Sequence, residues 1–144
     1  MTQGGTPRAR LPSQARLHQS REFQRVYKHG MRATGAWLTA VVLRQNVPKG
    51  VRLGVSVSKD NGSAVRRNKI KRLLREAFRL ERHALPPDID VVLIPRPNDA
   101  HATLPELRAE VARLCQQALE KRQRNSQRRR SREGDAKREG GEAR

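Results

Sequence analysis

Residues 63–82 constrain the fold of this chain most strongly, because on a helix they separate into two opposite faces. At 100° per residue, one apolar stripe lies within about 80° of Ile70 and contains Leu73, Leu74, Ala77 and Phe78. Within about 40° of the opposite pole lie Asn68, Arg72, Arg75 and Arg79. The pattern predicts a helix that packs its apolar stripe on a core and leaves a cationic row exposed.

This cationic row costs the isolated helix stability. Lys69 and Lys71 flank it, and Glu76 near its edge is the one acidic residue on that face. The i, i+4 pairs at 67/71, 71/75 and 75/79 are like-charged, and each costs a few tenths of a kcal/mol. Surface helices that serve stability alone interleave opposite charges. We therefore interpret the row as a binding face for a polyanion.

The whole chain is also strongly basic, with 32 Lys and Arg against 14 Asp and Glu, a formal net charge of +18. Such an excess repels itself in a compact state, which makes nucleic acid the leading partner class. The 144 residues are sized for one domain. Because the sequence has no long apolar run and no hydrophobic stretch of signal-peptide type, we expect a cytoplasmic protein without a membrane partner.

Three elements are expected before the basic helix. Residues 20–30 place Phe23, Val26 and Tyr27 on one helical face, with Ser20 as a candidate N-cap and Gly30 as a stop. Residues 37–43 are rich in β-branched side chains, and residues 51–58 alternate apolar and polar side chains. These patterns predict a short helix and then two strands joined around residues 46–50.

Two elements are expected after the basic helix. Residues 91–94 are apolar on both faces and are followed by Pro95 and Pro97, which predicts an interior strand and a βαβ crossover. Thr103 and Glu106 have the spacing of a capping box. It opens a last helix whose apolar positions are Leu104, Leu107, Val111, Leu114, Cys115 and Ala118. We interpret the single cysteine, Cys115, as core packing.

The two ends of the chain lack apolar periodicity. Residues 1–16 are interpreted as a flexible basic arm, residues 17–121 as the folded domain, and residues 122–144 as a disordered basic tail. The tail has no apolar residue larger than alanine, so it buries too little surface to offset the entropy of ordering.

The segment VRLGVSVSKDNGSAVRRNKIKRLLREAFR, residues 51–79, resembles the signature of the bacterial ribonuclease P protein component. The upstream segment EFQRVYKHG, residues 22–30, resembles that family's first helix, and the likeness covers about residues 17–121. The resemblance implies an α/β fold, an α+β two-layer sandwich with αβββαβα order. It also implies a left-handed βαβ crossover and a ribosomal-protein-like domain.

The same resemblance implies which residues contact RNA. The basic helix is expected to bind the catalytic RNA subunit through Arg66, Arg67, Asn68, Lys69, Lys71, Arg72, Arg75 and Arg79. Lys69 stands where the family pattern has arginine, so it keeps the charge and loses the planar fork that grips phosphate at two points.

A second surface of the family is a cleft that holds the single-stranded 5′ leader of precursor tRNA. The residues that match its lining are Phe23, Tyr27, Ser56, Ser58 and Lys59. Aromatic faces suit unpaired bases of any sequence, but Phe23 and Tyr27 share a helical face with Val26, and core packing is the alternative. Asp60 stands where the family often has a second basic residue, and Val41 stands where some members carry a tyrosine, which implies a weaker or differently weighted grip on the leader.

The resemblance implies that the protein is the noncatalytic subunit of an endoribonuclease that removes the leader to give the mature tRNA 5′ end. The active site and its Mg²⁺ then belong to the RNA, and we expect no cofactor and no small-molecule substrate on the protein alone. Asp88 and Asp90 are the one carboxylate pair at a strand entrance. We interpret them as a polar strand entry, with a metal site as the alternative.

Two other functions remain open on charge alone. A ribosome-associated or other structural RNA-binding protein explains the basic helix, but not the joint presence of residues 22–30 and 51–79 in their family pattern. A DNA-binding module needs a recognition helix in a helix-turn-helix or dimeric context, and neither context is visible in the sequence.

Overall fold

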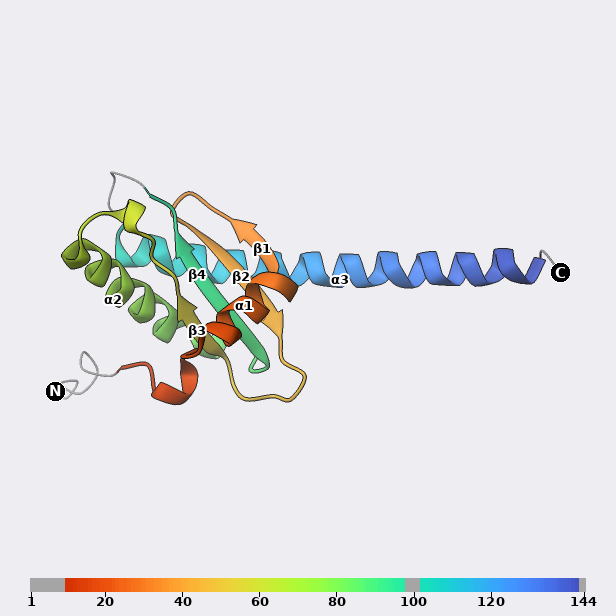
Figure 1. The fold of residues 1–144 in the computed structure, drawn as a ribbon, viewed down its shortest axis with the longest axis horizontal. Coiled ribbons are helices and arrows are strands. Elements are labelled where there is room, and N and C mark those ends of the chain that lie inside the picture. Colours follow the sequence, from red (N-terminus) through yellow and green to blue (C-terminus); the bar gives the residue numbers. More distant parts are fainter. Residues whose placement is uncertain (1–9, 98–101, 143–144) are drawn as a thin grey trace.

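The computed structural model describes residues 10–97 and 102–142, with side chains of the last helix described as far as residue 129 and at Ser131. Its main elements follow the order α1 (Ser20–His29), β1 (Met31–Thr34), β2 (Leu38–Arg44), β3 (Arg52–Val55), α2 (Ala64–Glu81), β4 (Ile89–Pro95) and α3 (Leu104–Glu142), as Figure 1 shows. Short 3-10 turns lie at Ser13–Ala15, Lys59–Asn61 and Arg82–Ala84. The αβββαβα order is confirmed.

The four strands form one sheet in the order β1-β2-β4-β3. β4 runs antiparallel to β2 and parallel to β3, so it is an interior strand, as its two apolar faces predict. β3, α2 and β4 make the expected βαβ crossover, whose handedness stays a prediction. β2 and β3 follow one another in the chain but do not pair, because β4 lies between them.

The strand boundaries differ from the sequence pattern in two places. β1, which pairs with β2 from Met31↔Val42 to Thr34↔Thr39, has only four residues and too short an alternation to stand out by periodicity. β3 ends at Val55, although the alternation runs on to residue 58. The Ser56 N–H still donates to the Leu93 carbonyl at 3.0 Å, after which the chain turns toward α2.

The main core lies between one face of the sheet and the helices α2 and α3. From α2 it takes Leu74, Ala77 and Phe78, with Ile70 and Leu73 partly buried at its margin. α3 contributes the predicted positions Leu107, Val111, Leu114, Cys115 and Ala118, all buried, and Leu104 packs against them. Burial raises the pKa of the Cys115 thiol to about 12, so this side chain is uncharged core packing as expected.

α1 covers part of the opposite face of the sheet. Val26 is fully buried there against Val41, Leu43 and Val92. The helix begins one residue earlier than expected, with Gln19 as its N-cap, and ends at the predicted Gly30. Gly30 lies so close to β2 that a Cβ there would lie 2.8 Å from Cγ1 of Val41. No larger residue fits at this turn without moving the helix.

Residues 10–16 differ from the flexible arm that the sequence predicts. Leu11 and Ala15 are buried in the main core, and Ala15 ends the turn Ser13–Ala15. Arg16 forms a bridge with Leu53, and the Leu17 N–H donates to the Leu53 carbonyl at 2.8 Å. Two apolar residues four apart are too few for a periodicity, so the pattern missed this packing. Residues 1–9 of the expected arm lie outside the described residues.

The last helix also differs from expectation, because α3 continues to Glu142 through the segment predicted to be a disordered tail. The Thr103 and Glu106 capping box that starts it is present, with the Thr103 N–H donating to Glu106 Oε1 at 2.9 Å. Arg, Gln, Lys, Glu and Ala are good helix formers, and extending an existing helix needs no new nucleus. The prediction of a disordered tail rested on its lack of apolar residues, and the helix preferences of its residues count for more.

Glu110 of α3 fixes the turn between β1 and β2 from inside the protein. Its carboxylate is only 4% exposed and accepts backbone N–H groups from Ala36 at 2.7 Å and from Trp37 and Leu38 at 2.9 Å. One side chain thus satisfies three buried or half-buried donors and joins α3 to the sheet. Among residues 10–97 and 102–142, no helix has the length and apolar character needed to cross a membrane.

Candidate nucleic-acid interface

The helix α2 lies at one end of the molecule (Figure 1) and carries the eight residues predicted to contact RNA, which are together called the basic face of α2. Ser63 caps the helix by accepting the Arg66 N–H on its hydroxyl at 3.2 Å. Asn68, Lys69 and Arg72 are exposed, whereas Arg66, Arg67, Lys71, Arg75 and Arg79 are half-buried. The structure therefore places all eight residues on α2 with some exposed surface, and the exposed members lie in the first half of the helix.

The cations of this face differ in whether they form ion pairs with carboxylates of the protein. Arg79 makes an ion pair with Glu76 on the same helix, which reduces what it offers to a ligand. Among the described residues, no ion pair joins Arg67, Lys69, Lys71 or Arg72 to a carboxylate. A row of half-buried and exposed cations without carboxylates is suited to a phosphate backbone.

Arg16 extends the basic face beyond α2, which the sequence did not indicate. It reaches α2 because residues 10–17 pack along β3, and it lies near Arg75. Burial, and then the positive charge of Arg16, lower the pKa of Arg75 below its ordinary value. Within the described structure, Arg16 Nε has no hydrogen-bond partner. Two neighbouring guanidinium groups with this environment favour an anion between or above them.

The second predicted surface is called the α1 surface, and its predicted members are Phe23, Tyr27, Ser56, Ser58 and Lys59. Phe23 and Tyr27 are half-buried, their ring centroids are 6.5 Å apart, and both pack against the cluster of Val26, Val41 and Val92. The rings therefore contribute to the smaller core, and each keeps part of its surface exposed. Core packing thus accounts for part of each ring, and contact with a leader stays a prediction.

The remaining predicted members of the α1 surface lie at the end of β3 and just beyond it. Ser56 is half-buried beside β4, and Ser58 and Lys59 are exposed where the chain approaches α2. Ser58 accepts the side-chain amide of Asn61 at 3.3 Å on its carbonyl and hydroxyl oxygens. Lys59 thus lies on the connection that leads from β3 to α2.

Further residues on this face of the sheet were missed by the sequence interpretation. Thr34, Thr39 and Ile94 are neighbours across β1, β2 and β4. By strand alternation they share the face of Val41 and Val92, and the hydroxyls of Thr34 and Thr39 are hydrogen-bonded at 3.1 Å. Arg32 on β1 lies over the Tyr27 ring at 5.9 Å from its centroid. These residues are brought together only by the pairing of the strands, and sequence patterns do not predict that pairing.

Gly54 determines how closely the Phe23 ring approaches the sheet. It is buried in β3, and a Cβ at this position would lie 2.6 Å from Cε1 of Phe23. Any other residue would push the ring off the sheet. The aromatic pair is therefore positioned from below by a glycine in the strand.

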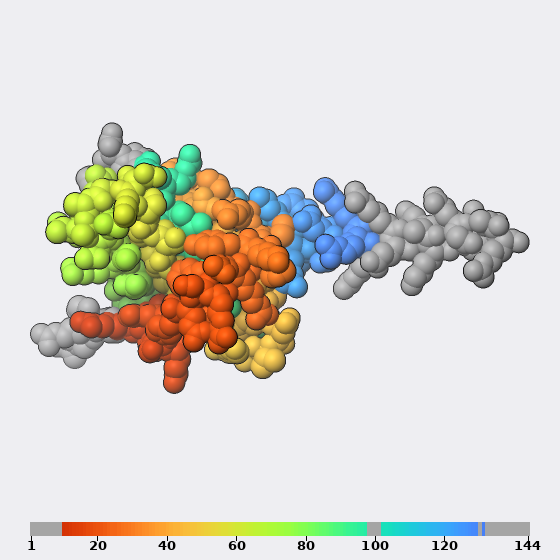
Figure 2. Space-filling model, viewed as in Figure 1, coloured from red at the N-terminus to blue at the C-terminus, as the bar shows by residue number. Residues whose placement is uncertain are grey.

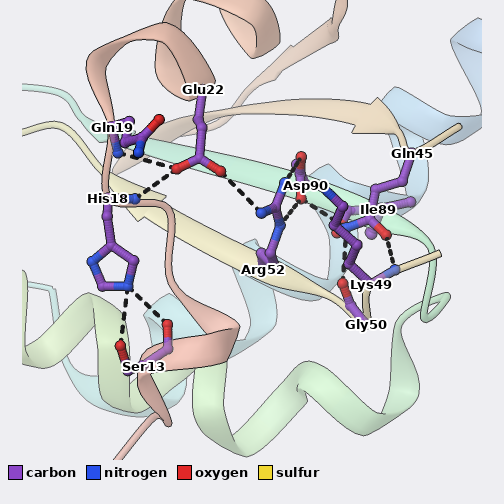
Figure 3. Close-up of polar contacts among 10 residues, drawn as sticks. All are labelled: Ser13, His18, Gln19, Glu22, Gln45, Lys49, Gly50, Arg52, Ile89 and Asp90. Carbon is purple, nitrogen blue, oxygen red and sulfur yellow. Dashed lines mark hydrogen bonds and ion pairs between the residues drawn. The ribbon is translucent and has the colours of Figure 1, made fainter. Parts of the chain in front are cut away.

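A polar network holds α1 against the sheet at its N-terminal end, as Figure 3 shows. Arg52 of β3 donates from Nε and Nη2 to the two carboxylate oxygens of Asp90, each at 2.8 Å, and from Nη1 to Glu22 Oε2 at 2.9 Å. Gln45 Nε2 also donates to Asp90 at 2.8 Å. Asp90 raises the pKa of Arg52, which outweighs the lowering by burial, and Glu22 raises it further.

Glu22 joins this network to the start of α1. Its Oε1 accepts the backbone N–H groups of His18 and Gln19, both at 3.1 Å. Burial would raise the pKa of Glu22, but these two backbone hydrogen bonds and Arg52 together lower it from its ordinary value. The first turn of α1 and the middle of the sheet are thus linked through ionised groups.

The two aspartates at the entrance of β4 are engaged by different arginines. Asp88 pairs with Arg44 at 2.6 Å, and Asp90 pairs with Arg52. Across residues 10–97 and 102–142, no group of three or more His, Cys, Asp or Glu side chains is arranged to hold a metal ion. Both carboxylates are thus engaged by arginines of the neighbouring strands.

Comparison with known proteins places this geometry in one family. The family model described as Ribonuclease P matches residues 11–119. The ribonuclease P protein component of Desulfotalea psychrophila is 39% identical over 108 residues, which cover 75% of this chain and 89% of that protein. That of Finegoldia magna is 37% identical over 112 residues, covering 78% and 97%. The solved Staphylococcus aureus RNase P protein is 30% identical with a TM-score of 0.62, covering 72% and 94%.

Proposed function

The chain belongs to the ribonuclease P protein family, whose members are the protein subunit of a ribonucleoprotein endoribonuclease in tRNA 5′ processing, and from this premise we propose how its surfaces divide the work. The basic face of α2 binds the RNA subunit. The α1 surface holds the single-stranded 5′ leader of precursor tRNA. The RNA carries the active site, and the protein acts in the cytoplasm, where precursor tRNA is processed.

The observation that carries the first assignment is the row of Arg67, Lys69, Lys71 and Arg72 along the first half of α2, without carboxylate partners among the described residues. Neutralising phosphates with such a row releases condensed counterions and gives affinity that depends steeply on salt. Asn68 is exposed in the middle of the row and has both a donor and an acceptor. It adds a directed contact to a base edge or a 2′-hydroxyl.

The α1 surface has the chemistry for an unpaired strand. The exposed parts of Phe23 and Tyr27 provide faces for stacking, which tolerates any base. Beside these rings lie two cations, Arg32 and Lys59, and the hydroxyl of Ser56. With Val41 buried beneath α1 and Asp60 exposed, the grip rests on these residues and not on the tyrosine and extra cation of the family pattern.

Reconstitution with the cognate RNA subunit at low Mg²⁺ tests the proposal. We expect the intact protein to raise the rate of leader removal well above that of the RNA alone. Arg67→Ala/Arg72→Ala should reduce this gain at limiting protein and regain it at excess protein, because the change weakens assembly and not chemistry. If the intact protein gave no gain over RNA alone, the proposed role would be wrong.

A further inference from the structure

The segment from residue 121 to residue 132, KRQRNSQRRRSR, is called the basic extension of α3. It contains no acidic residue, and it lies past residue 119, where the match to the family model ends. The family's shared surfaces therefore do not account for it. Its charge and its place on the fold indicate a separate role.

The basic extension is a helical segment whose described side chains take no part in the hydrophobic core. Every described side chain in it, from Lys121 to Arg129 and at Ser131, is exposed. Arg124, Arg128 and Arg132 follow one another at i, i+4, a spacing at which like charges destabilise a helix. A helix that is polar on all sides gains little from the protein itself. A polyanion alongside it would remove this repulsion and favour the helical form.

The basic extension starts close to the α1 surface, and this position indicates which RNA it contacts. It leaves the domain beside β1, where Lys121 Nζ donates to the Arg32 carbonyl at 2.7 Å and the Asn125 amide lies 4.0 Å from Met31 Sδ. Arg32 in turn lies over the Tyr27 ring. In Figure 2 the blue atoms of α3 adjoin the orange atoms that follow α1. The extension therefore begins next to the α1 surface.

The basic face of α2 lies at the opposite end of the molecule. Figure 1 shows the C-terminal part of α3 projecting away from the sheet on the side opposite to α2. The extension therefore lies closer to an RNA strand bound over α1 than to an RNA subunit bound on α2. At ~1.5 Å per residue, the twelve residues span roughly 18 Å, a length comparable to about five stacked nucleotides at ~3.4 Å each.

We propose that the basic extension prolongs the leader path, so that residues 121–132 bind the phosphates of the upstream part of a long 5′ leader. This inference rests on the proposed role of the α1 surface. The contact is electrostatic and carries no base preference. It makes the affinity of the holoenzyme for precursor tRNA increase with leader length beyond the nucleotides that the α1 surface holds.

The test uses the full-length protein assembled with its RNA subunit at saturating protein, under conditions that block cleavage. The dissociation constant is measured for precursor tRNAs whose leaders lengthen one nucleotide at a time. The test variant is Arg122→Gln/Arg124→Gln/Arg128→Gln/Arg129→Gln, which removes charge and keeps good helix formers. The matched control is Gln123→Ala/Ser126→Ala/Gln127→Ala, which changes the same helix and keeps its charge.

We expect intact protein and control to gain affinity over the whole leader series, and the test variant to stop gaining at a shorter leader. At the longest leader its affinity should be about tenfold lower at low salt. The affinity of the protein for the RNA subunit should stay within about twofold for all three proteins.

Other results separate the two proposals. If the test variant followed the intact protein at every leader length, or showed weaker affinity only for the RNA subunit, the role of the extension would be wrong while the α1 surface could stand. If even the intact holoenzyme gained nothing from any leader, the α1 surface proposal would fail and the extension proposal with it.

Discussion

Arg52 and Asp90 meet side by side, with Nε to Oδ1 and Nη2 to Oδ2 both at 2.8 Å, although 38 residues separate them in the chain. Their side chains are 15% and 9% exposed. Because Arg52 also binds Glu22 of α1, the pair fixes the helix that carries both aromatic residues of the α1 surface.

Asp90→Asn should destabilise the protein by about 2–3 kcal/mol, because it leaves the Arg52 guanidinium buried with one carboxylate partner fewer. The measurement is the free energy of unfolding in urea. Asp88→Asn is the matched control. Its ion pair with Arg44 is about one third exposed and should contribute less than about 1 kcal/mol. Equal destabilisation of the two variants would contradict the structural role of the Arg52 pair.

Acidification should weaken the link between α1 and the sheet. The pKa of Glu22 is lower in the folded state than its ordinary value of 4.5, so its contribution to stability is complete above that value. The contribution is lost as the pH falls from about the ordinary value through the lower folded one. We expect the unfolding free energy of Glu22→Gln to fall less over this range than that of the intact protein. Parallel curves would show that Glu22 does not titrate in this way.

Glu110→Ala should cost about 3 kcal/mol of stability, because three backbone N–H groups lose their acceptor inside the protein. Glu106→Ala on the exposed first turn of the same helix removes only a solvent-exposed capping interaction and should destabilise the protein much less. Thermal and urea unfolding of both variants measure the difference. A destabilisation by Glu110→Ala no larger than that by Glu106→Ala would mean that other groups or water replace the carboxylate.

Gly54→Val should displace the Phe23 ring, since a Cβ at residue 54 has only 2.6 Å to the ring. Base stacking on an aromatic side chain is worth about 1–3 kcal/mol, so the affinity of the holoenzyme for leader-bearing precursor should drop at least about fivefold. Affinity for mature tRNA should not change. Binding of the two RNAs to the same preparation gives the answer. An equal drop for both RNAs would indicate general disruption of the fold.

Arg72→Gln should weaken binding to the RNA subunit more than Arg79→Gln, because Arg72 is exposed and Arg79 is paired with Glu76. For each phosphate that the variant no longer neutralises, the slope of log affinity against log salt should fall by about 0.7–0.9. Salt titrations of the two variants make the comparison. The prediction fails if the two slopes are the same.

The sequence predicted best what local periodicity determines. The stripe containing Leu74, Ala77 and Phe78 is buried, and the Thr103 and Glu106 capping box is formed, because both depend on residues within one or two turns of a helix. The two apolar faces of residues 91–94 identified an interior strand for a similar reason. The resemblance to the family then supplied β1, whose four residues are too short for a pattern of their own.

Local periodicity does not predict interactions between residues that are far apart in the sequence. The pairing of Arg52 with Asp90 and the row of Thr34, Thr39 and Ile94 depend on strand register, and the position of Arg16 near Arg75 depends on how α2 packs. Periodicity assigns a residue to a face and does not say which residues of other strands lie beside it. The packed residues 10–16 and the continuation of α3 beyond residue 121 were missed because neither segment carries an apolar repeat.

The central claim is that two surfaces bind two different RNAs, and one set of binding measurements tests it directly. Arg67→Ala/Arg72→Ala and Tyr27→Ala are each assayed for affinity to the RNA subunit and, at saturating protein, for affinity of the holoenzyme to precursor tRNA with and without a leader. We predict that the first variant weakens only binding of the RNA subunit and the second weakens only binding that depends on the leader. The claim would be contradicted if either variant weakened both affinities to the same extent.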